Sequence, residues 1–308
     1  MGWAGQREAQ AMLEFFEFDF MRKAVVAVIV LSLGMAPVGC FLVLRRLSLA
    51  GEAMSHAAIP GIAVAYSIAG LSVLSMTLGG LLAGLGVALL STLLARVTLL
   101  REDANMATLY LLALAGGVFL LSVRGTAVNL ESFLFGNILG LRTSTLVLIG
   151  CSTSLTLLVM AMILRPLILQ TVDPVFARSQ SRHGWVISAL FMVLVVLNLI
   201  AGFRALGTLM AVGLMIVPAT AARFWVNAVT PMILLAVLIG AGSGLSGLAL
   251  SYWLDRVPSG PSIVLVTGGV FTLSLLLGQN GLNLAGRIAR LVQSNGGTVP
   301  PRSPDDPG

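Results

Sequence analysis

Hydrophobic blocks of about 20 residues recur along nearly the whole chain. A helix of that length spans about 30 Å, which is the thickness of the hydrocarbon core of a bilayer. A transmembrane β-barrel would instead show segments of about ten alternating residues, and the sequence has no such alternation. We therefore predict an all-α polytopic membrane protein with about nine transmembrane helices, eight to ten being possible. The predicted helices cover residues 21–44, 57–74, 75–95, 106–122, 144–164, 185–203, 207–224, 231–253 and 262–278.

Polar segments between these blocks predict the loops. Residues 48–56 separate the first two helices, residues 123–143 form a long semi-polar stretch, and residues 165–184 form the longest polar insert between helices. The predicted domains are an N-terminal extracytoplasmic segment (1–20), a transmembrane domain (21–290) and a C-terminal tail (291–308). The tail is rich in Gly, Pro and Asp, a composition that predicts disorder.

Proline and small residues indicate how the helices pack. Pro60 and Pro218 fall inside predicted helices, where a kink can mark a transport pathway but is as readily an ordinary packing feature. Small residues spaced by four let helices approach closely in lipid, and they predict a compact bundle. Such pairs are Gly80/Gly84, Gly240/Gly244 and Ser243/Gly247.

Composition and charge agree with a membrane protein. Of 308 residues, 57% are hydrophobic and only 10% are charged, against about 25% charged in soluble domains. The formal net charge of +6 could indicate nucleic-acid binding, but no basic run is interleaved with aromatic residues. Membrane proteins concentrate Lys and Arg in the loops on one side, so we predict no nucleic-acid partner. Cys40 and Cys151 lie in apolar blocks and are expected to be buried free thiols.

The positions of Lys and Arg predict the orientation. With the N-terminus outside, 11 of the 18 basic residues fall on the cytoplasmic side and 7 on the outside, which the positive-inside rule favours. This orientation places the insert at residues 165–184 in the cytoplasm. Acidic residues before the first helix argue against a cleaved signal peptide, so the first helix itself is expected to direct insertion.

Glu52 and His56 form the most informative polar pair. If this stretch is helical, residues four apart lie on one face. A carboxylate and a neutral imidazole are ligands suited to Zn²⁺, Mn²⁺ or Fe²⁺. One such pair makes only half a metal site, so the spacing by itself favours a Glu–His hydrogen bond that fixes the corner between two helices.

The insert contains a second candidate site. Asp173, followed by Pro174, predicts the N-cap and first position of a short helix that continues through Phe176 and Ala177. A short amphipathic helix between transmembrane helices could dock on a cytoplasmic partner, and a solvated loop is the equally open alternative.

Two further motifs concern enzymatic activity. The sequence from Gly244 to Gly247 matches the G-x-S-G of intramembrane serine proteases, with Ser246 as nucleophile and His56 as a conceivable base; small-residue helix packing explains it more simply. A Walker A loop requires a lysine after a glycine run, and the only lysine is Lys23, preceded by Arg22. The chain therefore cannot bind ATP in that way, and we expect it to have no catalytic residues.

Four stretches resemble the permease subunits of bacterial ABC importers for zinc, manganese or iron, the ABC-3 family. They are residues 39–57 (GCFLVLRRLSLAGEAMSHA), residues 134–139 (LFGNIL), residues 212–223 (VGLMIVPATAAR) and residues 258–265 (PSGPSIVL). By this resemblance, Glu52 and His56 correspond to an Asp and a His on the metal path, with Glu replacing the usual Asp. Asp173, Pro174, Phe176 and Ala177 similarly correspond to the coupling helix that seats on the ATPase.

The resemblance implies a specific assembly. It predicts a homodimeric permease in the lipid of the bacterial inner membrane, two cytoplasmic ABC ATPase subunits, and an extracytoplasmic metal-binding protein that delivers the ion. It implies no permanently bound cofactor, only a transported Zn, Mn or Fe ion. A secondary metal-ion or proton-coupled transporter is the alternative, and an internal repeat with several membrane-embedded acids would favour it.

Overall fold

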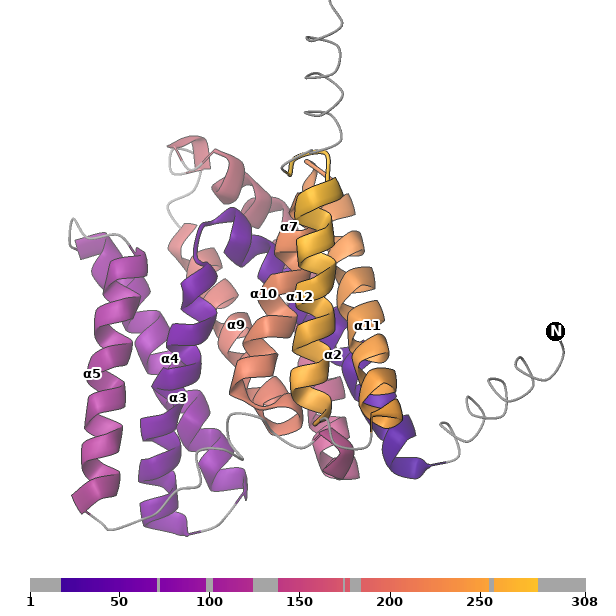
Figure 1. Ribbon diagram of the computed structural model, residues 1–308. Helices are drawn as coiled ribbons and strands as arrows, with labels where there is room; N and C mark the ends of the chain where they lie inside the picture. Colours follow the sequence, from indigo (N-terminus) through magenta and orange to yellow (C-terminus); the bar gives the residue numbers. More distant parts are fainter. Residues whose placement is uncertain are drawn as a thin grey trace, which may run out of the picture.

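The computed structural model describes residues 18–70, 73–97, 102–123, 138–173, 175–177, 184–254 and 258–281. Within these residues the regular structure is entirely helical, as predicted (Figure 1). The elements are α2 (Asp19–Leu44), α3 (Ser48–Ala69), α4 (Val73–Val97), α5 (Glu102–Val123), the 3-10 turn η1 (Ile138–Gly140), α7 (Thr143–Val172), α9 (Gly184–Leu206), α10 (Thr208–Arg223), α11 (Val229–Trp253) and α12 (Ser259–Leu277). Six of the described helices are long and apolar enough to cross a membrane.

The first predicted loop is wrong. Residues 48–56 are not a polar break but the opening turns of α3, which begins at Ser48 immediately after a tight corner. The stretch contains good helix formers, and its Ala50, Ala53 and Met54 side chains are buried in the core. Burial of this apolar face outweighs the polar residues that suggested a loop.

The predicted end of the fifth helix is also wrong. Arg165 and Pro166 suggested a loop after residue 164, yet α7 continues to Val172. A proline inside a helix removes one backbone hydrogen bond. The last turns of α7 are nevertheless stabilised by other contacts. Leu167 is fully buried, and the Thr171 hydroxyl donates a hydrogen bond to the Leu167 carbonyl at 2.7 Å. The insert between α7 and α9 therefore starts at Asp173.

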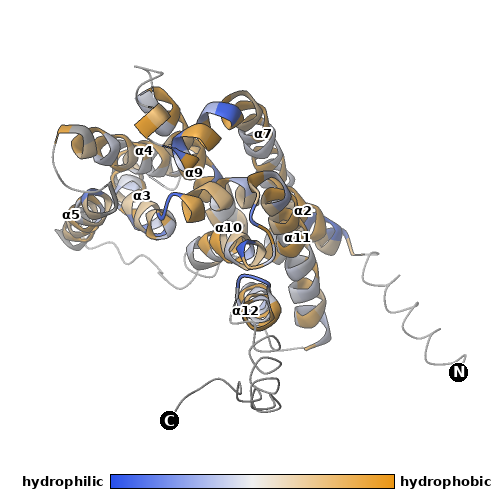
Figure 2. Cartoon of the chain, turned by 90° about the horizontal axis from the view of Figure 1, so that it is seen from above, coloured by the Kyte–Doolittle hydropathy of each residue, from blue (hydrophilic) through white to orange (hydrophobic). Residues whose placement is uncertain are grey.

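The helices pack in two groups around α2. On one side, α3, α4 and α5 pack on each other; on the other, α2 contacts α10, α11 and α7 (Figures 1 and 2). The groups are joined by α9, which contacts α4, α7, α10 and α2. The core between them is apolar and centres on Leu31, Met35, Phe41, Phe191 and Met215.

Glycines allow the closest approaches, and the tightest backbone contacts involve glycines outside the pairs that the spacing indicated. A Cβ on Gly39 of α2 would overlap the carbonyl oxygen of Met215 in α10, and one on Gly61 of α3 would overlap the carbonyl of Gly79 in α4. A Cβ on Gly244 would instead overlap the side chain of Val28 in α2. Large side chains at these positions would push the backbones apart, so the bundle requires small residues there.

Most residues along the helices are hydrophobic (Figure 2). Large apolar side chains such as Leu82, Leu112 and Leu238 are exposed on the surface of the bundle. A soluble monomer rarely exposes so many large apolar residues, whereas a bilayer solvates them. Cys40 is buried as expected, but Cys151 is exposed, contrary to expectation. Its position lies off the stripe of Ile149, Ser152 and Thr156 that α7 buries.

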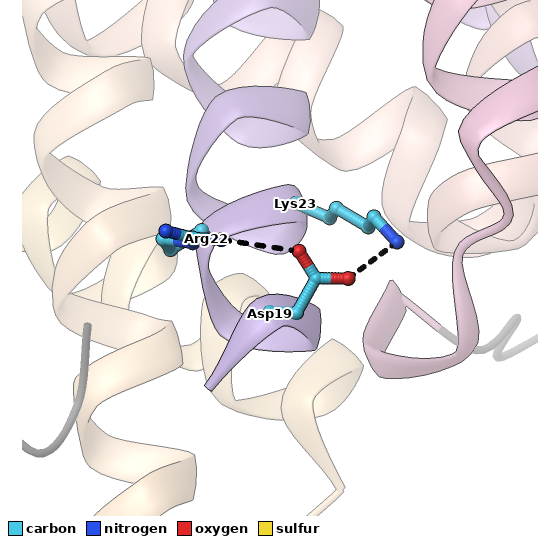
Figure 3. Close-up of polar contacts among 3 residues, drawn as sticks. All are labelled: Asp19, Arg22 and Lys23. Carbon is cyan, nitrogen blue, oxygen red and sulfur yellow. Dashed lines mark hydrogen bonds and ion pairs between the residues drawn. The ribbon is translucent and has the colours of Figure 1, made fainter. Parts of the chain in front are cut away.

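The start of α2 carries a small cluster of charged residues. Asp19 accepts from Lys23 at 2.6 Å and from Arg22 at 3.3 Å, at spacings of four and three residues (Figure 3). Asp19 and Arg22 are largely exposed and Lys23 is partly exposed, so the ion pairs contribute little stability. The predicted N-terminal segment and C-terminal tail lie outside the described residues, except for the few residues from 18 onward.

Candidate functional site

A rigid corner between α2 and α3 precedes the predicted metal ligands. Leu47 donates its backbone N–H to the Leu42 carbonyl at 2.8 Å, and Arg46 donates to Val43 at 3.1 Å. This pair of bonds defines a Schellman motif, which usually places glycine in the left-handed region. Here Arg46 takes that conformation, with φ 60°. The turn fixes the direction in which α3 begins.

Glu52 and His56 lie on the opening turns of α3, four residues apart, so the helix holds both on one face. Glu52 is exposed and His56 is half-buried. The opposite side of this segment is packed: a Cβ on Gly51 would lie 2.9 Å from the methyl of Met215 in α10. Packing of Gly51 on α10 therefore leaves the Glu52 side chain exposed, while His56 faces α5.

The His56 ring stacks on Tyr110 of α5, with ring centroids 6.1 Å apart and planes inclined by 28°. Tyr110 is packed against the core. Stacking restricts the rotation of the imidazole and so orients its ring nitrogens. Sequence reasoning missed this residue. The available signal was a single tyrosine in the otherwise apolar helix predicted at 106–122.

The pair alone is half of a metal site. The described residues contain no group of three or more His, Cys, Asp or Glu side chains that could hold a metal ion. A transition-metal ion bound by a protein usually takes four or more ligands. A complete metal site built on Glu52 and His56 therefore requires further ligands. These would come from water molecules, from other groups around the transported ion or from a second chain.

The two prolines lie inside helices, as predicted. Pro60 lies one turn beyond His56, on the same face of α3. It contacts α5, because a Cβ on Gly117 in α5 would lie 2.6 Å from the Pro60 Cβ. Pro218 lies within α10 near Gly240 of α11. Both prolines are therefore helix-packing residues at the junctions of the bundle.

The predicted cap in the insert is present. Asp173 accepts a hydrogen bond from the Phe176 backbone N–H at 2.9 Å, and its carbonyl accepts from Ala177 at 3.0 Å. Pro174 lies outside the described residues. Val175 and Phe176 are 78% and 51% exposed, whereas Ala177 is buried. We call residues 173–177 the coupling segment. It presents apolar side chains outward at the end of α7.

Three of the four stretches singled out in the sequence meet at α10. Gly39 and Gly51, from the first stretch, both pack on Met215, which belongs to the third. The fourth reaches the same helix, because a Cβ on Gly213 would lie 3.7 Å from Val264. The second stretch (134–139) is described only from Ile138, which is buried.

The protease motif has a structural explanation. Gly244 packs on Val28 of α2 and Gly247 packs on Ile263 of α12, while Ser246 is exposed. His56 contacts α5, on the other side of α2 and α10 from α11 (Figure 1). The structure therefore does not bring Ser246 and His56 together.

Comparison with known proteins gives a consistent result. The model of the ABC 3 transport family matches residues 17–278. A manganese transport system membrane protein, MntC of Halalkalibacterium halodurans, is 33% identical over 85% of this chain and 88% of its own length. A zinc transport system membrane protein, TroC of Treponema pallidum, is 32% identical over 88% of this chain and 94% of its own length. The solved PsaBC of Streptococcus pneumoniae in complex with Fab superposes with a TM-score of 0.77 at 28% identity, covering 91% of this chain and 99% of that one.

Proposed function

This chain belongs to the ABC 3 transport family, and we propose that it is the permease through which an ATP-driven importer moves manganese, zinc or iron into the bacterial cytoplasm. Members of the family are transport subunits of the membrane, and ATP is hydrolysed by a separate subunit. The protein is accordingly a multi-pass membrane permease and not an enzyme. The relatives' names mention manganese and zinc.

The Glu52–His56 pair carries the proposal. One carboxylate and one imidazole, held on the same face of α3, offer the oxygen and nitrogen donors that first-row divalent ions accept. The pair is only half a site within one chain. A two-fold homodimer presents the same surface twice, so two copies supply four protein ligands to one ion.

The coupling segment supports an ATPase partner. Its backbone is capped by Asp173, and it carries the exposed apolar side chains of Val175 and Phe176 at one end of the bundle. A short helix of this kind fits an apolar groove on a cytoplasmic subunit. In the same assembly, an extracytoplasmic metal-binding protein delivers the ion to the opposite end.

The orientation is part of the same proposal. The Arg45 end of α2 and the coupling segment lie at one end of the bundle, and the Asp19 end of α2 lies at the other (Figure 1). If the coupling segment is cytoplasmic, α2 begins outside, as the basic residues predict. We propose that the nine described α-helices all cross the membrane, including α3, α5 and α10, which are not among the six clear spans.

Transport in this assembly follows alternating access. ATP-driven closure of the two ATPase subunits would move the coupling segments together and shift the permease between outward- and inward-facing states. The alternative of a secondary transporter is not favoured, because the family to which the chain belongs is one of ABC transporters.

A complementation experiment tests the function. A bacterium lacking this gene is supplied with the wild-type chain or with Glu52→Ala, and cellular manganese, zinc and iron are measured in parallel. We expect wild type to restore one of these metals and Glu52→Ala to restore none. If neither the wild-type chain nor the variant changes any metal, the proposed substrate class is wrong.

A further inference from the structure

Arg45, the last residue before the α2–α3 corner, contacts both flanks of the insert that carries the coupling segment. Its Nη2 donates to Gln170 Oε1 at 3.0 Å and its Nε donates to Thr171 Oγ1 at 3.3 Å, both at the end of α7. Its Nη1 donates to Ser188 Oγ at 3.4 Å, in the opening turns of α9. One guanidinium therefore joins the helix that precedes the insert to the helix that follows it.

The two flanks are also bonded to each other around Arg45. Gln170 Oε1 accepts a second hydrogen bond from the Ser188 hydroxyl at 3.3 Å, and Gln170 Nε2 donates to the Gly184 carbonyl at 2.8 Å. Gln170 thus uses both ends of its amide within this network. The insert leaves α7 and enters α9 at one closed polar cluster, and Arg45 is the member that α2 contributes.

An aromatic face holds the guanidinium in place from the apolar side. The Arg45 Cζ lies 5.2 Å from the centroid of the Phe191 ring, within the range of a cation–π contact. Phe191 is fully buried and packs edge-to-face on Phe41 of α2, with centroids 6.2 Å apart. Because Arg45 is partly buried and packed on this ring, its guanidinium group has little freedom to reorient.

The segment that follows Arg45 in the chain contains the candidate metal ligands. Arg45 is followed by the Schellman corner at Arg46 and Leu47, and Leu47 is buried in the core. The chain then enters α3, where Glu52 lies one turn beyond Ser48. A displacement of the α7–α9 junction is therefore passed by one side chain and one rigid turn to the helix that carries Glu52 and His56.

We propose that Arg45 is the positioning residue that transmits movement of the coupling segment to the metal pair; this rests on the proposed function above. Arginine suits this role because its planar fork reaches three acceptors at fixed angles, which the single ammonium of lysine cannot do. In this role Arg45 acts through α3 and is not itself a metal ligand. It fixes how far and in which direction α3 follows the junction.

The test uses the complex purified from its native membrane through a tag on this chain and reconstituted in proteoliposomes. Uptake of Mn²⁺ and Zn²⁺ and hydrolysis of ATP are measured together, which gives metal ions transported per ATP. For Arg45→Gln we expect this ratio to fall by roughly tenfold, the range of a typical coupling between sites, with the KM for metal unchanged. For Arg45→Lys we expect a ratio between that of wild type and that of Arg45→Gln.

Arg142→Gln is the matched control. It removes the same charge from an exposed residue at the opposite end of α7, outside the α2–α3 corner, and it is expected to leave the ratio unchanged. A merely structural role for Arg45 would lower ATP hydrolysis and transport together and leave the ratio intact. A wild-type ratio in Arg45→Gln overturns the proposal.

The acceptors provide an independent arm in case Arg45→Gln fails to fold. Gln170→Leu combined with Ser188→Ala keeps Arg45 but removes two of its partners, and it is expected to lower the ratio in the same way. A wild-type ratio in that variant also overturns the proposal. If instead wild type transports neither metal, the proposed function fails, which is a different outcome from active transport that is insensitive to Arg45.

Discussion

The imidazole of His56 in α3 stacks on the phenol ring of Tyr110 in α5, with centroids 6.1 Å apart. The contact joins helices that are separated by α4 along the chain, and it holds one of the two candidate metal ligands against the apolar core. Tyr110 is therefore expected to orient His56 in the proposed metal site without itself being a ligand.

Loss of the Tyr110 ring should weaken metal capture. Ring stacking contributes about 0.5–1.5 kcal/mol beyond area burial, so Tyr110→Ala is expected to raise the KM for metal uptake by about two- to tenfold. Tyr110→Phe keeps the ring and serves as the control, with a KM near that of wild type. Equal KM values for the alanine and phenylalanine variants would show that the stack does not orient His56.

Gly39→Ala tests the closest contact between the first and third stretches of the family resemblance. The new Cβ would overlap the Met215 carbonyl oxygen, a backbone atom that cannot rotate away. Overpacking of this kind costs about 1–3 kcal/mol, so we expect a lower midpoint of thermal unfolding in detergent. Gly242→Ala is the control, because no atom lies within 4 Å of its Cβ position. A midpoint for Gly39→Ala equal to that of the control would contradict the packing described.

Asp173→Ala should weaken association with the ATPase. Loss of an N-cap costs roughly 1 kcal/mol of helix stability, and the bond lost is the one from Phe176 N–H to Asp173 Oδ1. We expect less ATPase to co-purify with the tagged permease, while its unfolding midpoint stays unchanged. Asp173→Asn retains a capping oxygen and should co-purify as wild type does. Full association of the alanine variant would show that the cap does not contribute to docking.

Arg46→Gly should stabilise the permease. Arg46 is the one described non-glycine residue with positive φ, at 60°, and glycine adopts this conformation without the steric cost that a Cβ brings. We expect a gain of about 1 kcal/mol, seen as a higher unfolding midpoint in detergent. A lower midpoint would mean that the Arg46 side chain makes stabilising contacts that outweigh the backbone strain.

The helices could be predicted because bilayer thickness sets the length of an apolar block. The helix ends could not be predicted as well. The start of α3 was missed because the corner is closed by Arg46 in a conformation that a sequence normally signals with glycine. The end of α7 was missed because Arg165 and Pro166 have the composition of a loop, whereas Leu167 and Gln170 are held by tertiary contacts.

The candidate site was predictable only where its residues are close in sequence. The spacing of Glu52 and His56 and the cap at Asp173 are local patterns, and the structure shows the pair on α3 and the capping hydrogen bond at Asp173. Tyr110 and the partners of Arg45 come from other helices, and Thr171, Gln170 and Ser188 lie 125 to 143 residues from Arg45. No local pattern reports contacts of that kind. The role of the Glu52–His56 pair remains a prediction.

Metal transport by a variant lacking both ligands tests the central claim most directly. The double variant Glu52→Ala, His56→Ala is reconstituted with its ATPase in proteoliposomes, and uptake of Mn²⁺ and Zn²⁺ is compared with wild type and with the Tyr110→Phe control. The account predicts that the double variant hydrolyses ATP but transports neither ion, while the control transports as wild type does. Intact uptake of either ion by the double variant would contradict the assignment of these residues to the metal path.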